Sequence, residues 1–322
     1  MTTGKPQLSV WDQAARDADL TLRLPGGVPM FFRRIPAGRF LLGSRGYSPD
    51  EEPIHQVVIP RDFYLGTFVV TQAQYRAVAI RCPALKKNPA PSHFKGDRHP
   101  VEQVSWEDAV AFCGWFKTSK SLPPGIVEAR LPAEVEWEYA CRAGSRTEYY
   151  CGDGEAALSE VAWFSNNSEN RTHAVDELPE KHPLGLHGLH GNVWEWCADV
   201  YDSQAYRQRA DGWEAPAWSE TDAGIKKSSE ITRVLRGGSW DDSAGFCRSA
   251  FRNWFWPDER SLLIGFRVCL VRGPADSQNR SGAEPVPGDA GRGTRPESVG
   301  TGGVLRKRRP TPRSGSKKIN VP

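Results

Sequence analysis

The chain has 322 residues, 39% of them apolar, with 12 tryptophans and a formal net charge of +3. A chain of this length and composition can bury a substantial core, which favours a globular protein and excludes a fibrous or wholly disordered one. No stretch approaches the roughly 18 uninterrupted apolar residues of a membrane helix, and the opening MTTGKPQLSVWDQAARDADL has neither a basic leader nor an apolar core. We therefore expect a cytoplasmic protein without a transmembrane segment.

Residues 1–30 are interpreted as a lead-in, and the first predicted strands follow it. FFRRIPAGRFLLGS has two short apolar runs around Pro36-Ala37-Gly38, a pattern that predicts a hairpin with its turn at these residues. HQVVIPRDFYLGTFVVT predicts two more strands. The domain is therefore expected to contain several short strands near its start.

Two helices are predicted in the middle of the chain. In VSWEDAVAFCGWF, Ser105 is a good N-cap with Asp108 three residues later, and the apolar residues recur at helical spacing up to Phe116. In RLPAEVEWEYACRAG, Pro132 suits a first helical turn and Gly144 suits a C-terminal cap after Arg142. The rest indicates short strands and long ordered loops, rich in Gly, Pro, Asn and Asp.

The seven cysteines are odd in number, widely scattered and never arranged as CxxC. This pattern indicates neither a disulfide framework nor a zinc site, so reduced and mostly buried thiols are expected.

Residues 273–322 have a different composition from the preceding domain, which is placed at residues 31–272. They contain ten Lys/Arg against four Asp/Glu and almost no aromatic or branched apolar residue. Such a segment cannot bury enough surface to offset chain entropy, so a disordered basic tail is predicted. Its VLRKRRP run would attract nucleic acid, an acidic partner or a membrane surface, the alternative being a solvated tail without a partner.

Eight segments in order resemble the formylglycine-generating-enzyme (sulfatase-modifying-factor) family. They are IPAGRFLLGS, EEPIHQVVI, FVVTQAQY, HPVEQVSWEDAVAFC, RLPAEVEWEYACRAG, GLHGLHGNVWEWCADVY, LRGGSW and IGFRV. The resemblance implies an α+β, irregular and loop-rich C-type-lectin-like fold with two main helices and short antiparallel strands. Because one scaffold serves several functions, the function has to be argued from the site.

The family resemblance implies a copper ion held by two thiolates that lie five residues apart, just after the GGS motif. Here that segment is RGGSWDDSAGFCRSAFR, in which Asp242 stands at the first position and Cys247 at the second, while Ser239 of the motif is retained. Cu(I) is soft and prefers two sulfur ligands, so copper is not expected to bind. No residue is assigned a catalytic role with confidence, and Ser239, Asp242 and Cys247 are the residual candidates.

The resemblance also implies a calcium site near GNVWEW. Gly191, Val193 and Glu195 match the family's positions, whereas Gly188 replaces an upstream Asn or Asp. The alternative is an ion-free loop in which Glu195 is hydrogen-bonded inside the domain. His187 and His190 in the same loop could share a metal ion, although loop histidines more often bond to backbone.

Between LRGGSW and IGFRV, aromatic residues alternate with arginines, a composition typical of protein-binding hot spots. We predict a binding face at residues 240–263. Its candidate contacts are Trp240, Asp241, Phe246, Phe251, Trp254, Phe255, Trp256 and Leu262.

The sequence is therefore interpreted as a non-catalytic or catalytically altered domain that binds a protein or peptide ligand. One alternative is a formylglycine-generating oxidase that converts a peptidyl cysteine in a sulfatase-type substrate. The other rests on a similarity to the variable proteins of diversity-generating retroelements, which share the fold and display substitutable positions in this region.

Overall fold

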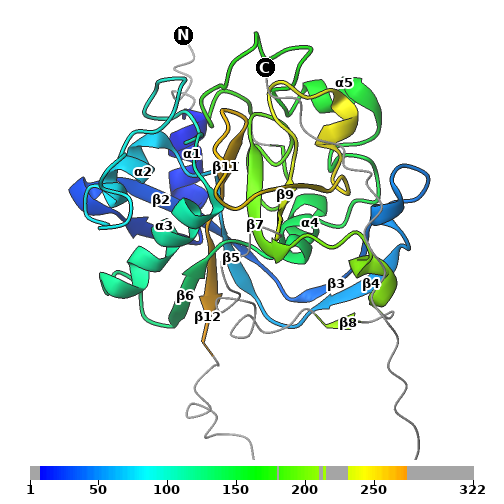
Figure 1. The fold of residues 1–322 in the computed structure, drawn as a ribbon, viewed down its shortest axis with the longest axis horizontal. Helices are drawn as coiled ribbons and strands as arrows, with labels where there is room; N and C mark the ends of the chain where they lie inside the picture. Colours follow the sequence, from blue (N-terminus) through cyan, green and yellow to red (C-terminus); the bar gives the residue numbers. More distant parts are fainter. Residues whose placement is uncertain (1–7, 180, 210–212, 215–230, 274–322) are drawn as a thin grey trace, which may run out of the picture. The chain divides into compact units, whose positions relative to one another are not determined.

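The computed structural model describes residues 8–179, 181–209, 213–214 and 231–273, and the predicted tail lies outside them. Figure 1 shows how the elements are arranged. The helices are α1 (Val10–Asp17), α2 (Gln72–Ala79), α3 (Trp106–Thr118), α4 (Glu134–Arg142), α5 (Gly154–Ser159) and α6 (Ala205–Gln208). Short 3-10 helices cover Pro25–Gly27, Pro49–Glu51 and Ala244–Cys247. Among the described helices, none is long and apolar enough to cross a membrane.

The strands form three small sheets. They are β1 (Leu20–Arg23), β2 (Pro29–Ile35), β3 (Gly38–Leu42), β4 (His55–Ile59), β5 (Phe63–Gly66), β6 (Ile126–Arg130), β7 (Trp194–Val200), β8 (Trp213–Glu214), β9 (Arg233–Arg236), β10 (Asn253–Phe255), β11 (Ile264–Phe266) and β12 (Cys269–Arg272). The strand orders are β1-β2-β5-β12-β6, β10-β9-β7-β11 and β3-β4-β8. Pairing is antiparallel except where β11 lies parallel to β7 and β8 parallel to β4.

The hairpin predicted around residues 36–38 is wrong. β2 and β3 do not pair with each other; β2 pairs with β5 and β3 pairs with β4. The two ladders form one long hairpin that bends where Pro36 and Pro60 interrupt its strands, since proline has no N–H to donate to a ladder. Asp62 fastens the bend by accepting hydrogen bonds from the Ala37 amide at 2.7 Å and from Arg34 at 2.8 Å.

The helix predicted from Ser105 is confirmed as α3. The Ser105 hydroxyl accepts from the Asp108 amide at 3.1 Å, and the Asp108 carboxylate accepts from the Ser105 amide at 3.1 Å. This reciprocal capping box fixes the N-terminus of the helix from local sequence alone.

The second predicted helix is confirmed as α4, with a different start and cap. Pro132 lies before the N-cap Ala133 rather than in the first turn. The free amide of Glu134 donates to Asp199 at 2.7 Å, so a residue near the end of β7 satisfies this helix terminus. At the other end Ala143, with φ 44°, takes the left-handed conformation expected of Gly144.

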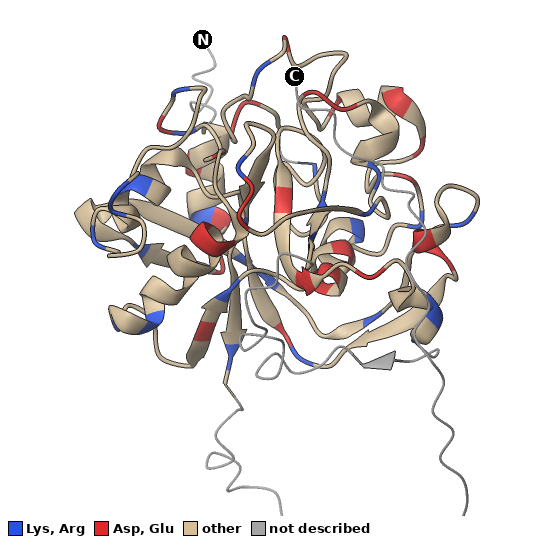
Figure 2. Ribbon diagram, in the orientation of Figure 1, with Lys and Arg blue, Asp and Glu red and all other residues tan. Residues whose placement is uncertain are grey.

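The core of the domain is organised around α4, which is buried on nearly all sides. Its three glutamates lie inside the domain, each paired with arginine, and Figure 2 shows acidic residues gathered on this helix. The pairs are Glu134 with Arg252, Glu136 with Arg130, and Glu138 with both Arg142 and Arg236. Because a buried charge is tolerated only when it is paired and hydrogen-bonded, α4 holds these arginine-bearing segments in register.

We predict that Glu138→Gln destabilises the domain by about 3–5 kcal/mol, because it leaves the buried Arg142 without a carboxylate partner and Arg236 with only its 3.8 Å contact to Glu134. Urea unfolding measures the loss. Glu160→Gln is the matched control, since Glu160 is exposed and pairs with the exposed Lys181, and it should leave the unfolding midpoint nearly unchanged. Equal midpoints for the two variants would contradict a structural role for the buried pairs.

Candidate functional site

The segment after β9 carries the three residual catalytic candidates. The chain turns through Gly237 and Gly238, which have φ angles of 98° and 77°. A Cβ at Gly238 would lie 2.5 Å from the Cys247 Sγ, so only glycine allows the thiol to pack against this turn. The fold therefore brings Ser239, Asp242 and Cys247 into one buried corner.

Asp242 is bound inside this corner by Ser239. Its Oδ2 accepts a hydrogen bond from the Ser239 amide at 3.0 Å and another from the Ser239 hydroxyl. Burial raises the pKa of Asp242 in spite of these hydrogen bonds. The carboxylate therefore acts as an internal acceptor that fixes the turn.

Cys247 lies in an apolar environment. It is fully buried in a small core with Tyr149, Leu158, Val161, Ala162 and Phe164. Burial raises the pKa of the Cys247 thiol well above its ordinary value, and the nearby Asp242 carboxylate raises it further. Since the thiolate is the nucleophile and the metal ligand, this environment keeps the sulfur in its unreactive form.

The corner does not fit a Cu(I) ion. It offers one hard carboxylate, already hydrogen-bonded, and one thiol that is held protonated, whereas the soft ion prefers two thiolates. No oxidation step is derived through such a site.

Glu195 is buried and hydrogen-bonded inside the domain. This is the arrangement that the sequence analysis gave as the alternative to a calcium ligand. Both carboxylate oxygens accept from Arg267, at 2.8 and 3.0 Å, and Oε2 also accepts from the Trp137 indole at 2.9 Å. The guanidinium also donates to the backbone oxygens of Gly66, Thr67 and His187 at 2.8–2.9 Å. A fixed cation thus neutralises Glu195 and joins three segments.

Gly191 and Val193, the other expected calcium ligands, are buried. Gly191 is required by packing, because a Cβ there would lie 2.1 Å from the Trp163 carbonyl oxygen. Within the described residues, no group of three or more His, Cys, Asp or Glu side chains is placed to hold a metal ion. The carboxylate of Glu195 is thus occupied by Arg267 instead of being open to a calcium ion. Calcium binding at this loop stays a prediction.

His190 is bound through both ring nitrogens to groups of the protein itself. Nδ1 donates to the Cys247 carbonyl at 2.8 Å, and Nε2 accepts from the Tyr150 amide at 3.2 Å. Burial lowers the pKa of His190 to about 3, so the ring is neutral. It links the loop before β7 to the segment that carries Cys247.

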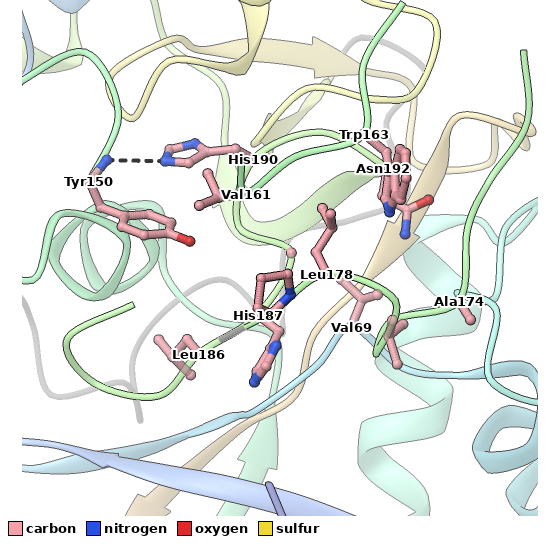
Figure 3. A pocket seen from close by; sticks show the side chains of 13 residues that line it. Val69, Tyr150, Val161, Trp163, Ala174, Leu178, Leu186, His187, His190 and Asn192 are labelled. Carbon is pink, nitrogen blue, oxygen red and sulfur yellow. Dashed lines mark hydrogen bonds between the residues drawn. The ribbon is translucent and has the colours of Figure 1, made fainter. Parts of the chain in front are cut away.

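A narrow pocket lies beside this histidine, which forms part of its lining. Figure 3 shows Val69, Val161, Leu178 and Leu186 on its walls, together with His187. Burial lowers the pKa of His187 to about 3, and its ring packs against Phe68 with centroids 4.6 Å apart. The pocket is therefore lined by apolar and neutral polar side chains, which suits a neutral group rather than an ion.

Trp240 was predicted to belong to the binding face at residues 240–263, and the structure shows that it is buried. This side chain is only 7% exposed, it packs edge-on against Phe94 with ring centroids 5.6 Å apart, and its indole donates to the Leu262 carbonyl at 3.3 Å. It is a core residue. Asp241 is exposed, and Leu262 is half-buried.

The remaining aromatic residues of the face form two separate groups. Phe246, 37% exposed, packs edge-on against the half-buried Phe251 with ring centroids 4.9 Å apart. Trp256, 40% exposed, packs against Trp254 on the edge strand β10, with centroids 6.4 Å apart. Phe255, also half-buried, lies on β10 directly after Trp254, so successive side chains of the strand point to opposite faces.

The sequence interpretation missed the loop at residues 43–54 as part of this surface. Tyr47, 54% exposed, stacks over the Arg248 guanidinium at 3.8 Å, and Arg248 in turn lies 5.7 Å from the Phe251 ring centroid. The available signal was an aromatic residue in a Gly- and Ser-rich turn, which is unusual unless the ring has a partner. The Phe246 end of the predicted face therefore continues onto Tyr47.

Comparisons with known proteins show which family and which fold this chain resembles. The family described as sulfatase-modifying factor enzyme 1-like domain matches residues 31–272. The formylglycine-generating enzyme of Streptomyces coelicolor is 29% identical over 313 residues, covering 78% of this chain and 91% of that enzyme. The serine/threonine-protein kinase pkn1 of Chlamydia caviae is 29% identical over 255 residues, covering 72% of this chain. The match spans only 37% of the kinase's own length.

Among solved structures, the variable protein 1 of Treponema denticola is similar to this chain with a TM-score of 0.64 and 28% identity, covering 78% of this chain and 98% of that protein. Together these matches confirm the predicted α+β, C-type-lectin-like fold.

We predict that the stability of the domain depends on pH through His187. The ordinary histidine pKa is 6.5, whereas the folded value is about 3, so the unfolded chain binds a proton that the folded chain does not. Stability is therefore lost as pH falls from 6.5 toward 3. Between pH 7 and about pH 4 this one group accounts for about 3 kcal/mol.

Urea unfolding of His187→Phe at both pH values tests this dependence. The substitution keeps an aromatic ring against Phe68, and the variant should lose about 3 kcal/mol less than the wild type on acidification. His93→Phe, at an exposed position, is the control and should behave as the wild type does. An unchanged pH dependence in His187→Phe would contradict a neutral buried imidazole.

Proposed function

The chain belongs to the sulfatase-modifying-factor family, and from that premise we propose that it is a catalytically altered member that binds a protein or peptide ligand. The observation that carries the proposal is the replacement of the family's first copper-ligand cysteine by Asp242, which is hydrogen-bonded to Ser239 inside the domain. The second cysteine position, Cys247, is kept but holds a buried thiol with a raised pKa. The residues that would perform the family's oxidation thus have structural roles.

The binding surface proposed is the Phe246 end of the 240–263 face, extended by Tyr47. Exposed aromatic rings that are held by neighbours lose little entropy when a ligand covers them, which is why Tyr, Trp and Arg dominate interface hot spots. Phe246 is held by Phe251, and Tyr47 by Arg248. Trp256 provides a second exposed aromatic anchor, next to Trp254.

A second candidate function is display of a variable ligand-binding surface, favoured by the likeness to the Treponema denticola variable protein. Asp241, Ser243 and Phe246 are exposed and could vary. Ser261 and Leu263, in the same region, are buried and are unsuited to display. Sequencing this gene across many isolates of its source organism tests the candidate, which requires substitutions concentrated at the exposed positions.

We predict that a phage-displayed random-peptide library selected on the full chain yields peptides whose binding depends on this surface. Phe246→Ala should weaken a recovered peptide at least tenfold, because a hot-spot side chain contributes upward of about 1.4 kcal/mol. Ile80→Ala is the matched control, since Ile80 is an exposed apolar residue next to α2, and it should bind peptide as the wild type does.

Fluorescence anisotropy of the labelled peptide measures both affinities. Failure to recover any peptide that depends on Phe246 would contradict the proposed function at this surface.

A further inference from the structure

A surface pocket lies beside the Phe246 end of the face. Its walls come from the loop after β3, the segment that follows α4, and the segment after Cys247. The side chains that line it include Arg45, Tyr47, Ile54, Arg146, Glu148 and Arg248.

One side of the pocket is rigid because its charges are paired internally. The buried Arg248 donates to both oxygens of Glu51 at 2.9 Å, and the Tyr47 ring covers its guanidinium. The Tyr47 hydroxyl donates to Glu148, which lies on the opposite wall. These contacts hold the Tyr47 ring in place beside the pocket, which lowers the entropic cost of binding a ligand against it.

The acidic groups that line the pocket are already engaged. Glu148 accepts from the Tyr47 hydroxyl and from the Gly154 amide, the latter at 2.9 Å. Asp153 accepts from the Glu148 amide at 2.8 Å. These donors are neutral, so both carboxylates keep their charge, but each already holds a hydrogen bond within the protein.

The basic groups on the rim differ in this respect. Arg45 and Arg146 are exposed, and among the described residues neither has a hydrogen bond or an ion pair. Arginine offers two parallel N–H donors that match a carboxylate, so an unpaired guanidinium on a pocket rim can bind one without first breaking an internal pair. The groups free to meet a ligand are thus cationic.

The rim also carries apolar surface. Tyr47 and Ile54 are among the large apolar side chains exposed to solvent. The contacts of Arg248 with Tyr47 and Phe251, and of Phe251 with Phe246, connect this rim to the proposed peptide surface. A ligand seated on Phe246 can therefore extend into the pocket.

We infer that this pocket binds the acidic side chains of a peptide, with Arg45 and Arg146 as the carboxylate-binding residues and Phe246 receiving an adjacent apolar side chain. The inference rests on the proposed function and adds the chemical class of its ligand.

The test is the composition and charge dependence of the peptides selected on the full chain. Wild-type protein should enrich Asp and Glu next to an aromatic or aliphatic residue. The Arg45→Glu/Arg146→Glu double variant should lose this enrichment and bind a recovered acidic peptide at least tenfold more weakly. Lys86→Glu/Lys87→Glu changes the charge equally at two exposed residues outside the pocket and should bind as the wild type does.

The outcomes separate this inference from the function on which it rests. Peptides that depend on Phe246 but lack acidic enrichment, or that bind the double variant unchanged, would overturn the acidic pocket and leave the peptide-binding function standing. Absence of any peptide dependent on Phe246 would remove both. Release of the bound peptide by inorganic phosphate at a lower concentration than by glutarate would assign the pocket to phosphate and overturn the carboxylate.

Discussion

Buried ion pairs between glutamate and arginine are the interaction on which this irregular fold depends. Burial opposes ionisation of Glu134 on α4, yet Arg252 and Arg236 hold the pKa of its carboxyl below the usual value. An isolated buried charge costs several kcal/mol, so each pair is stable only when both partners are in place. The ion pairs of α4, and the pair between Glu195 and Arg267, join segments that lie far apart in the sequence. Long loops can therefore be ordered without a wide sheet.

The same chemistry accounts for the change of function that we propose. Arg248 and Glu51 hold the segment that carries Cys247 against the loop at residues 43–54, so this region keeps its shape although its copper-ligand pair is incomplete. Asp242 has become a hydrogen-bond acceptor of the turn, and Ser239 its donor. A scaffold that no longer depends on the oxidation site can retain the surrounding surface as a binding site, with Phe246 and Tyr47 exposed at its edge.

Features governed by local sequence were predictable, and features governed by distant partners were not. The start of α3 follows from Ser105 and Asp108, three residues apart, whose reciprocal hydrogen bonds cap the helix. The turn at residues 36–38 was wrongly predicted because the true partners of β2 and β3 come later in the chain, from 13 residues (Leu42 with His55) to 34 residues (Phe32 with Gly66). Trp240 was assigned to the surface because sequence composition does not show that Phe94 covers it. The Asp242 and Cys247 corner was visible in the sequence, whereas the contribution of Tyr47 required the fold.

Anaerobic titration with Cu(I), followed by exposure to oxygen and a cysteine-containing sulfatase-motif peptide, tests the central claim most directly. The account predicts no Cu(I) binding that depends on Cys247 in the wild-type chain and no conversion of the peptide cysteine to an aldehyde by mass spectrometry. Asp242→Cys, which restores two sulfur ligands, should bind one Cu(I) ion that Cys247→Ala in the same background removes. Stoichiometric Cu(I) binding and aldehyde formation by the wild-type chain would contradict a catalytically altered binding domain.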